Sequence, residues 1–247
     1  MKKRQLLWAT LVLLLIWEIA ALLLDEPILP TPVQVAKVFV QELLYGQLLG
    51  HFLISFWRVI ASIFLAILAA VPLGLVLGQS KRLNSLSAPF IYILYPIPKI
   101  VFVPIILLLF GIGDLAKIMI IFLILFFQIL VLVRDQAATI RGELVQSVRS
   151  LGAGRRALFR YVYWPASLPA ILTAIRQSVG SAIAVLYIAE LVATRKGLGY
   201  YIYLNGSTLF NYAAMYAGIV AVSLMGMFLY YFVDWLERRA CRWEFLD

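Results

Sequence analysis

Residues 118–133 read IMIIFLILFFQILVLV, an apolar run that only Gln128 interrupts. A helix needs about 20 mostly apolar residues to cross a hydrocarbon core of about 30 Å, and this stretch with its flanking residues is long enough. Five further stretches of the chain meet the same requirement. We place the six spans at 5–24, 57–78, 88–110, 115–133, 169–192 and 213–235. The sequence therefore predicts an all-α membrane protein with six transmembrane helices in a single domain over residues 1–247.

The composition excludes the ordinary soluble classes. Of the 247 residues, 64% are apolar and 13% are charged, and the mean hydropathy is +0.98. Soluble proteins are about 45–50% apolar and about 25% charged, so this chain is neither a soluble globular domain nor a disordered segment. Cys241 is the only cysteine, which excludes an intrachain disulfide. The net charge of +9 lies in the gaps between apolar runs, so we expect no nucleic-acid partner.

Lysine and arginine are unevenly divided between those gaps. With the N-terminus inside, fourteen of them lie on the cytoplasmic side and five on the outer side. Cytoplasmic loops carry such an excess, so both termini are predicted to be cytoplasmic, which agrees with an even number of spans. The first span follows Lys2, Lys3 and Arg4. Its apolar run reaches Leu24, longer than the roughly 7–15 residues of a signal peptide core, so we expect it to be retained.

The segment after the first span has the form of a helix start. Thr31 is suited to cap a helix whose first residue is Pro32, where the missing proline N–H costs nothing. Apolar residues of 33–49 then gather near one face, which predicts an amphipathic helix on the outer membrane surface. The alternative is a helix packed on the other spans without a separate role.

The longest segment between spans is a cytoplasmic loop over 134–165. Leu144, Val148, Leu151, Leu158 and Val162 recur at helical spacing, with five arginines of 141–160 around them. The glycines at 152 and 154 would divide the loop into two short helices. This pattern favours a docking device for another protein. The alternative is that the arginines only neutralise anionic membrane lipid at the inner leaflet.

The same loop resembles the EAA signature of permease subunits of bacterial ABC importers. That signature is Glu-Ala-Ala, three residues, Gly, nine residues and Ile-x-Leu-Pro. Here Gly152 fills the glycine and Pro165 the proline, and all spacings are kept. The chain departs from the letters, because Gln146-Ser147-Val148 replaces Glu-Ala-Ala and Trp164 replaces the leucine.

Fragments along nearly the whole chain resemble one branch of that family. The branch contains permeases for nitrate, sulfonates, taurine and bicarbonate, and importers of thiamine precursors. The fragments are Leu29-Pro30-Thr31-Pro32, Ser55-Phe56-Trp57-Arg58-Val59, Pro72-Leu73-Gly74-Leu75, Tyr95-Pro96-Ile97-Pro98, Phe110-Gly111-Ile112-Gly113, Arg149-Ser150-Leu151-Gly152-Ala153 and Gly197-Leu198-Gly199-Tyr200. Their order and spacing together make the resemblance specific.

The resemblance implies the type I ABC importer permease fold and a multi-pass location in the cell inner (plasma) membrane. It implies a second permease copy, for which we expect a homodimer. It also implies two ATP-binding subunits inside and a periplasmic or lipoprotein substrate-binding protein outside. The substrate would be a small anion (nitrate, sulfonate, taurine or bicarbonate) or a heterocycle like a thiamine precursor. The chain lacks a G-x-x-x-x-G-K-[ST] motif, so ATP hydrolysis belongs to the partner, and we expect no enzymatic activity and no cofactor.

In that family, the short helix at the start of the EAA loop fits a groove of the ATPase. By position this helix covers about 146–151 and ends at Gly152, where positive φ and close backbone approach suit a glycine. The residues predicted to couple to the ATPase are Gln146, Ser147, Val148, Arg149, Leu151, Gly152, Ala153 and Pro165.

The third and fifth predicted spans, which carry prolines and a Gly-Ser step, are our candidates for the translocation pathway. The candidate lining residues are Tyr95, Pro96, Pro98, Lys99, Ser178 and Ser181. Lys99 either meets an anionic substrate or hydrogen-bonds carbonyls that the prolines free, and we favour the second. Glu190 and Arg176 lie too far apart on one helix to pair, so each is expected to find water or a neighbouring helix. His51, the only histidine, is expected at the surface, and no metal site is predicted.

Two other functions are open to an apolar chain of this kind. A membrane-embedded enzyme needs a nucleophile with its base, a carboxylate pair or a His-rich metal motif. A stand-alone secondary carrier would be expected to show inverted internal repeats. The sequence offers neither feature clearly, and the basic loop would remain unexplained in both cases.

Overall fold

The computed structural model describes residues 3–192 and 194–244 of the chain. Within these residues the regular structure is helical throughout. Lys2, one of the basic residues counted before the first span, lies outside the described residues. The chain divides into two compact units: unit 1 comprises residues 1–56 and 190–224, and unit 2 comprises residues 57–189 and 225–247.

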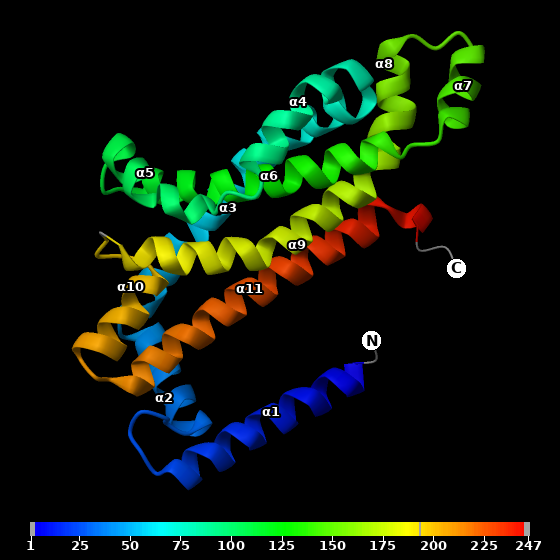
Figure 1. Cartoon of the computed structure of the whole chain (residues 1–247). Helices are drawn as coiled ribbons and strands as arrows, with labels where there is room; N and C mark the ends of the chain where they lie inside the picture. Colours follow the sequence, from blue (N-terminus) through cyan, green and yellow to red (C-terminus); the bar gives the residue numbers. More distant parts are fainter. Residues whose placement is uncertain (1–2, 193, 245–247) are drawn as a thin grey trace. The chain divides into compact units, whose positions relative to one another are not determined.

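The α-helices follow one another along the chain with short connections (Figure 1). They are α1 (Lys3–Leu24), α2 (Pro32–Leu44), α3 (Leu48–Gln79), α4 (Lys81–Leu94), α5 (Val103–Phe110), α6 (Asp114–Ala138), α7 (Gly142–Ser150), α8 (Arg155–Leu158), α9 (Trp164–Leu191), α10 (Leu198–Tyr203) and α11 (Tyr212–Ala240). Short 3-10 turns cover Lys99–Phe102 and Arg242–Glu244, and π-helical turns cover Phe159–Tyr163 and Leu204–Thr208.

Among the residues that the structure describes, five helical segments are long and apolar enough to cross a membrane, and a bent pair of helices brings the number of spans to as many as six. The predicted all-α membrane fold is therefore confirmed. Two spans begin well before the predicted residue: α3 begins at Leu48 rather than at 57, and the fifth helical segment begins at Arg156 rather than at 169. The helices α6 and α11 each end five residues later than predicted, at Ala138 and Ala240. Gly50 and His51 lie within α3, and Pro165 and Pro169 lie within the fifth segment, so none of these residues ends its helix.

The third predicted span, over 88–110, is not one continuous helix. The helices Lys81–Leu94 and Lys99–Phe110 meet at a bend of 77°. Pro96 and Pro98 explain the break. Pro98 has no N–H to give to the carbonyl of Leu94, one turn earlier, and each proline also disfavours helical backbone at the residue before it.

In unit 2, α3 and α6 approach each other closely at two glycines of α3. A β-carbon on Gly74 would lie 2.9 Å from Cβ of Val133, and one on Gly78 would lie 2.4 Å from the carbonyl oxygen of Arg134. This small-x-x-x-small spacing lets two membrane helices pack backbone to backbone. The Ser62 hydroxyl adds a polar contact, 3.1 Å from the Ile118 carbonyl of α6.

Unit 2 also joins α9 to α11 through charged side chains. The Arg176 guanidinium lies 2.8 Å from the Asp234 carboxylate, in a hydrogen-bonded ion pair. It lies 3.0 Å from Glu237, an ion pair without hydrogen-bond geometry. As expected, Arg176 finds a neighbouring helix rather than Glu190.

In unit 1, the helix start predicted at residues 31 and 32 is confirmed. Thr31 caps α2 by accepting from the N–H of Gln34, and the Gln34 side chain accepts from the N–H of Thr31 in return. The helix ends at Leu44, earlier than the 49 predicted, because α3 starts only four residues later. Trp17 of α1 fixes the chain before the cap by donating from its indole to the Pro30 carbonyl over 3.1 Å.

Candidate functional site: coupling loop and Lys99 pocket

The loop that is predicted to be cytoplasmic folds as two short helices, α7 and α8, joined by a turn at Gly152 (Figure 1). The division of the loop at the two glycines is thus as predicted. The first helix is longer than expected, since α7 covers Gly142–Ser150 rather than 146–151. Its four extra residues include Glu143, whose charge suits the positive end of the helix dipole.

Gly152 ends α7 in the geometry of a Schellman cap. Its φ is +83°, and its N–H donates to the Arg149 carbonyl at 2.9 Å. The next N–H, that of Ala153, lies 3.4 Å from the Val148 carbonyl. These 5→2 and 6→1 bonds satisfy carbonyls at the helix end, and a left-handed residue at their centre favours glycine. The positive φ expected at this position is confirmed.

The whole of α7 lies at the surface: none of its residues is buried. Leu151 directly after it is 86% exposed, although its side chain is entirely apolar. Leu144 and Val148 turn to a pocket of about 370 Å³, whose other lining residues are Tyr161, Val162, Pro165, Ala166 and Trp243. Of the predicted coupling residues, Val148 and Pro165 therefore line this pocket. Gln146, Ser147, Arg149, Leu151 and Gly152 are exposed, and Ala153 is half-buried.

A second pocket of unit 2, the Lys99 pocket, lies beside the break of the third span. It has a volume of about 470 Å³. Its lining residues are Tyr95, Pro96, Ile97, Pro98, Lys99, Ile100, Ile124, Phe127, Gln128 and Ser181. The structure thus brings five of the six candidate pathway residues together. The sixth, Ser178, does not line this pocket: it is buried, and its hydroxyl donates to the Ala174 carbonyl of its own helix at 2.7 Å.

Lys99 fills the hydrogen-bonding gap that the prolines leave. Its ammonium donates to the carbonyl of Leu94 at 2.8 Å and also to the carbonyl of Tyr95. Leu94 is the residue whose helical partner would be Pro98, which has no N–H. The ammonium also lies 4.7 Å from the centre of the Phe127 ring. These are the contacts expected of a lysine that hydrogen-bonds carbonyls freed by the prolines.

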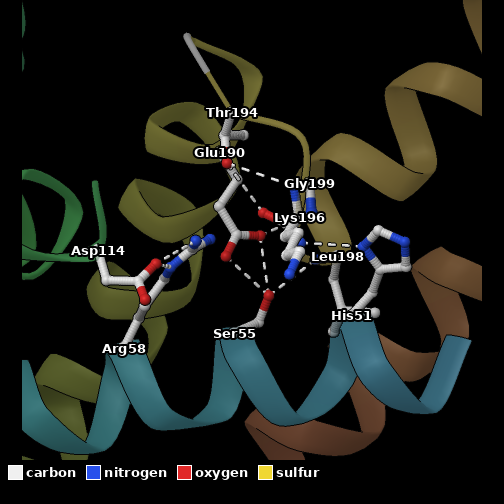
Figure 2. A network of polar contacts seen from close by, with 10 residues as sticks. His51, Ser55, Arg58, Asp114, Glu190, Thr194, Lys196, Leu198 and Gly199 are labelled. Carbon is white, nitrogen blue, oxygen red and sulfur yellow. Dashed lines mark hydrogen bonds and ion pairs between the residues drawn. The ribbon is translucent and has the colours of Figure 1, made fainter. Parts of the chain in front are cut away.

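Unit 1 contains a buried polar network that we call the Glu190 clasp: Ser55, Glu190 and the backbone of 197–199 (Figure 2). Glu190, at the end of α9, is 0% exposed. Its carboxylate accepts from the Ser55 hydroxyl of α3 and, at 2.8 Å, from the N–H of Gly199. The Ser55 oxygen accepts in turn from the N–H of Leu198 at 2.7 Å. The turn that begins α10 is thereby held by side chains of two other helices.

His51 belongs beside this clasp, and the prediction that it is a surface residue is wrong. It is 7% exposed, and its Nδ1 accepts from the N–H of Gly197 at 3.0 Å (Figure 2). Its ring lies 5.4 Å from that of Tyr201, centre to centre. The error has a physical reason: the predicted start of the second span at 57 left His51 in a loop, whereas α3 includes it.

Sequence reasoning missed two polar features of these sites. Gln128 lines the Lys99 pocket, and the one signal that could have found it is that it alone interrupts the apolar run of 118–133. The partners Ser55 and Gly199 of Glu190 lie 135 and nine residues away in the chain, and no local pattern connects them.

The chain matches known proteins over most of its length. The family model described as "binding-protein-dependent transport system inner membrane component" covers residues 62–241. A probable ABC transporter permease of Brucella abortus (strain 2308) is 31% identical over 88% of this chain and 86% of its own length. The taurine transport system permease TauC of Escherichia coli (strain K12) is 30% identical over 92% of this chain and 85% of its own length.

A solved structure shares the fold. A chain of the MetNI methionine ABC transporter, in inward-facing conformations, aligns with a TM-score of 0.69 at 20% sequence identity. The alignment covers 81% of this chain and 98% of that one. This likeness agrees with the predicted type I importer permease fold.

The family settles the broad function. Membership excludes the membrane-embedded enzyme and the stand-alone carrier, because ABC permeases are non-catalytic membrane subunits that pair with separate ATPase subunits. It also confirms a multi-pass location in the inner membrane. The chain belongs to the family of binding-protein-dependent transport system inner membrane components, the permease subunits of ABC importers.

Proposed function

We propose that two copies of this chain form the translocation pathway of an ATP-driven importer, and that the 141–165 loop transmits ATPase movements to it. In this proposal residues 1–247 act as one permease domain, with both termini in the cytoplasm. The excess of basic residues in the gaps assigned to the cytoplasm supports the orientation.

The observation that carries the coupling role is the exposed helix α7 with its glycine cap. An isolated nine-residue helix in water is marginal, since helices shorter than about 12–15 residues rarely hold by themselves. Here the Schellman cap at Gly152 ends the helix sharply and leaves Leu151 exposed beside it. A rigid helix end with an uncovered apolar side chain suits insertion into a groove of the ATP-binding subunit.

Alternating access requires segments with two arrangements of similar free energy. Broken helices are tolerated in membranes where they line a cavity. The bend of 77° between α4 and the 99–110 segment lies beside the Lys99 pocket, which supports a place for that pocket in the pathway.

The substrate in this proposal is a small anion such as taurine, a sulfonate, nitrate or bicarbonate. A cationic side chain at the pocket wall favours anions, and the likeness to a taurine permease supports this class. A heterocycle like a thiamine precursor is the alternative that the family branch leaves open. A periplasmic or lipoprotein binding protein would deliver the substrate.

A pull-down from native membranes in mild detergent tests this proposal. The tagged chain is captured beside its Gly152→Arg variant, and copurifying proteins are identified by mass spectrometry. The proposal expects an ATP-binding subunit with the wild type and its loss with the variant. Differently tagged copies of the chain in one cell should capture each other. Absence of an ATP-binding subunit from folded wild type, or capture that Gly152→Arg leaves unchanged, would refute the coupling role.

A further inference from the structure

Two polar side chains that line the Lys99 pocket form no hydrogen bond to the other residues that the structure describes. Gln128 reaches it from α6 and Ser181 from α9. Within residues 3–192 and 194–244, neither side chain forms a hydrogen bond to another residue. A carboxamide in the middle of a membrane span is costly unless it meets a polar partner. Its place in a pocket wall therefore calls for a partner that enters from outside the chain.

Lys99 is poorly placed to be that partner's main contact. Two of its three N–H groups are directed to the carbonyls of Leu94 and Tyr95. Aromatic rings cover the ammonium on two further sides, those of Tyr95 at 5.3 Å and Phe127 at 4.7 Å. Its positive charge still attracts an anion into the pocket, but its donors are largely taken by the protein.

Gln128 and Ser181 have the complementary properties. A carboxamide offers two N–H donors and a hydroxyl offers one, and neither brings a charge that would have to be neutralised on release. A transport site must bind its substrate without holding it, so neutral donors beside a fixed charge are suited to transient binding of an oxyanion. The volume of about 470 Å³ is within the usual range of about 300–1,000 Å³ for small organic ligands and far larger than an inorganic anion needs.

We propose that Gln128 and Ser181 are the specificity-determining residues of the pathway, and that they donate hydrogen bonds to the oxyanion group of a small organic sulfonate. Lys99 selects for negatively charged substrates, and its hydrogen bonds to the Leu94 and Tyr95 carbonyls stabilise the break in the helix. This inference rests on the proposed function, since it assigns the substrate contacts of the same pathway.

The test measures uptake of radiolabelled taurine, ethanesulfonate and nitrate by cells that carry the whole transporter, with this chain supplied from a plasmid. We expect wild type to take up the two sulfonates. Gln128→Leu and Ser181→Ala should each lower sulfonate uptake by about tenfold, the scale of one lost hydrogen bond to a charged group. Gln128→Glu, which places a negative charge in the pocket, should lower it further.

Matched controls separate binding from folding. Gln136→Leu changes an exposed glutamine of the same helix α6, and Ser223→Ala removes a hydroxyl that donates to the Ile219 carbonyl of its own helix. Both should transport sulfonates at the wild-type rate. Purified complexes of all variants should elute with all their subunits in size-exclusion chromatography, which shows that assembly is intact.

The outcomes distinguish a wrong assignment of Gln128 and Ser181 from a wrong substrate class. If wild type transports a sulfonate and Gln128→Leu transports it equally well, the assignment of these residues is wrong and the proposed function stands. If wild type with a coupled ATPase transports none of the anions, the substrate class of the proposed function fails and the assignment fails with it. Loss of the assembled complex together with loss of uptake in Gln128→Leu and Gln128→Glu would show a structural role and overturn the inference.

Discussion

The hydroxyl of Ser55 lies 2.8 and 2.9 Å from the two carboxylate oxygens of Glu190, which is 135 residues away in the chain. The same hydroxyl oxygen accepts from the N–H of Leu198. Ser55 is therefore the centre of the Glu190 clasp, where α3, the end of α9 and the start of α10 meet within unit 1. A buried network of this kind stabilises its fold only while each member is satisfied.

Replacement of Glu190 by alanine should destabilise unit 1 strongly. The change leaves the Ser55 hydroxyl and the Gly199 N–H without their acceptor, and each unsatisfied buried group costs about 1–3 kcal/mol. We expect a clear fall of the thermal unfolding midpoint in detergent. Glu26→Ala, at an exposed position of the same unit, serves as the control. Equal midpoints for the two variants would show that the clasp contributes nothing.

Gly197 should not tolerate even a methyl group. Its φ is +117°, and a β-carbon there would lie 2.3 Å from the carboxyl carbon of Glu190. Gly197→Ala combines a disfavoured backbone with a clash against a buried carboxylate, so we predict a loss of folded protein in size-exclusion chromatography. Gly50→Ala should elute as wild type, because a β-carbon added there, on α3, would meet no other part of the described chain within 4 Å. A monodisperse Gly197→Ala protein with wild-type yield would refute this account of the turn.

The Arg176–Asp234 ion pair should show measurable coupling. Removal of one member takes this contact from the other, which keeps a second partner, Glu237 for Arg176 and Arg238 for Asp234. Residues in one ion-pair network typically couple by about 0.5–3 kcal/mol. A double-mutant cycle with Arg176→Met and Asp234→Asn measures this coupling in the free energy of unfolding. Arg238→Ala is the control, because that exposed side chain also contacts Asp234 but should contribute little. A coupling energy of zero would mean that the pair does not stabilise the α9–α11 contact.

Cys241 provides the readout for such measurements. It is 0% exposed, and burial raises the pKa of its thiol, with the nearby Glu244 and Glu237 charges adding to the effect. A maleimide dye reacts with the thiolate, so we predict slow labelling of folded protein at pH 7 and fast labelling on unfolding. Because folding raises the thiol pKa, the contribution of the protonated thiol to the free energy of unfolding is complete below the unfolded pKa of about 8.5. It is lost as the pH rises through the pKa of the folded protein. Fast labelling of folded protein at pH 7 would contradict this burial.

Local sequence signals predicted several elements correctly. The Thr31 cap with Pro32, the exposed helix before Gly152 and the positive φ of Gly152 all follow from the residues that form them. The apolar runs located the spans. These features depend on neighbours within a turn or two, which the sequence displays directly.

The features that the sequence did not predict depend on distant partners. His51 is buried because the turn at 197–199 covers it, and Glu190 is satisfied by Ser55 of another helix. Close packing of α3 on α6 at Gly74 and Gly78 likewise needs both helices to be placed. The bend at Pro96 and Pro98 is different, because its cause is local: the prolines mark the third span as irregular, although they do not give the angle of the bend.

Substrate-stimulated ATPase activity of the purified complex tests the central claim, that the glycine-capped α7 couples the ATPase to this chain. Four proteins are compared: wild type, Gly152→Asn, Gly152→Arg and Gly154→Arg. Asparagine tolerates positive φ. Gly154 lacks the positive φ of Gly152, and a β-carbon added to it would meet no atom of the described residues within 4 Å. The account predicts strong stimulation in wild type and Gly154→Arg, partial stimulation in Gly152→Asn and none in Gly152→Arg. Equal stimulation in Gly152→Arg and wild type would contradict it.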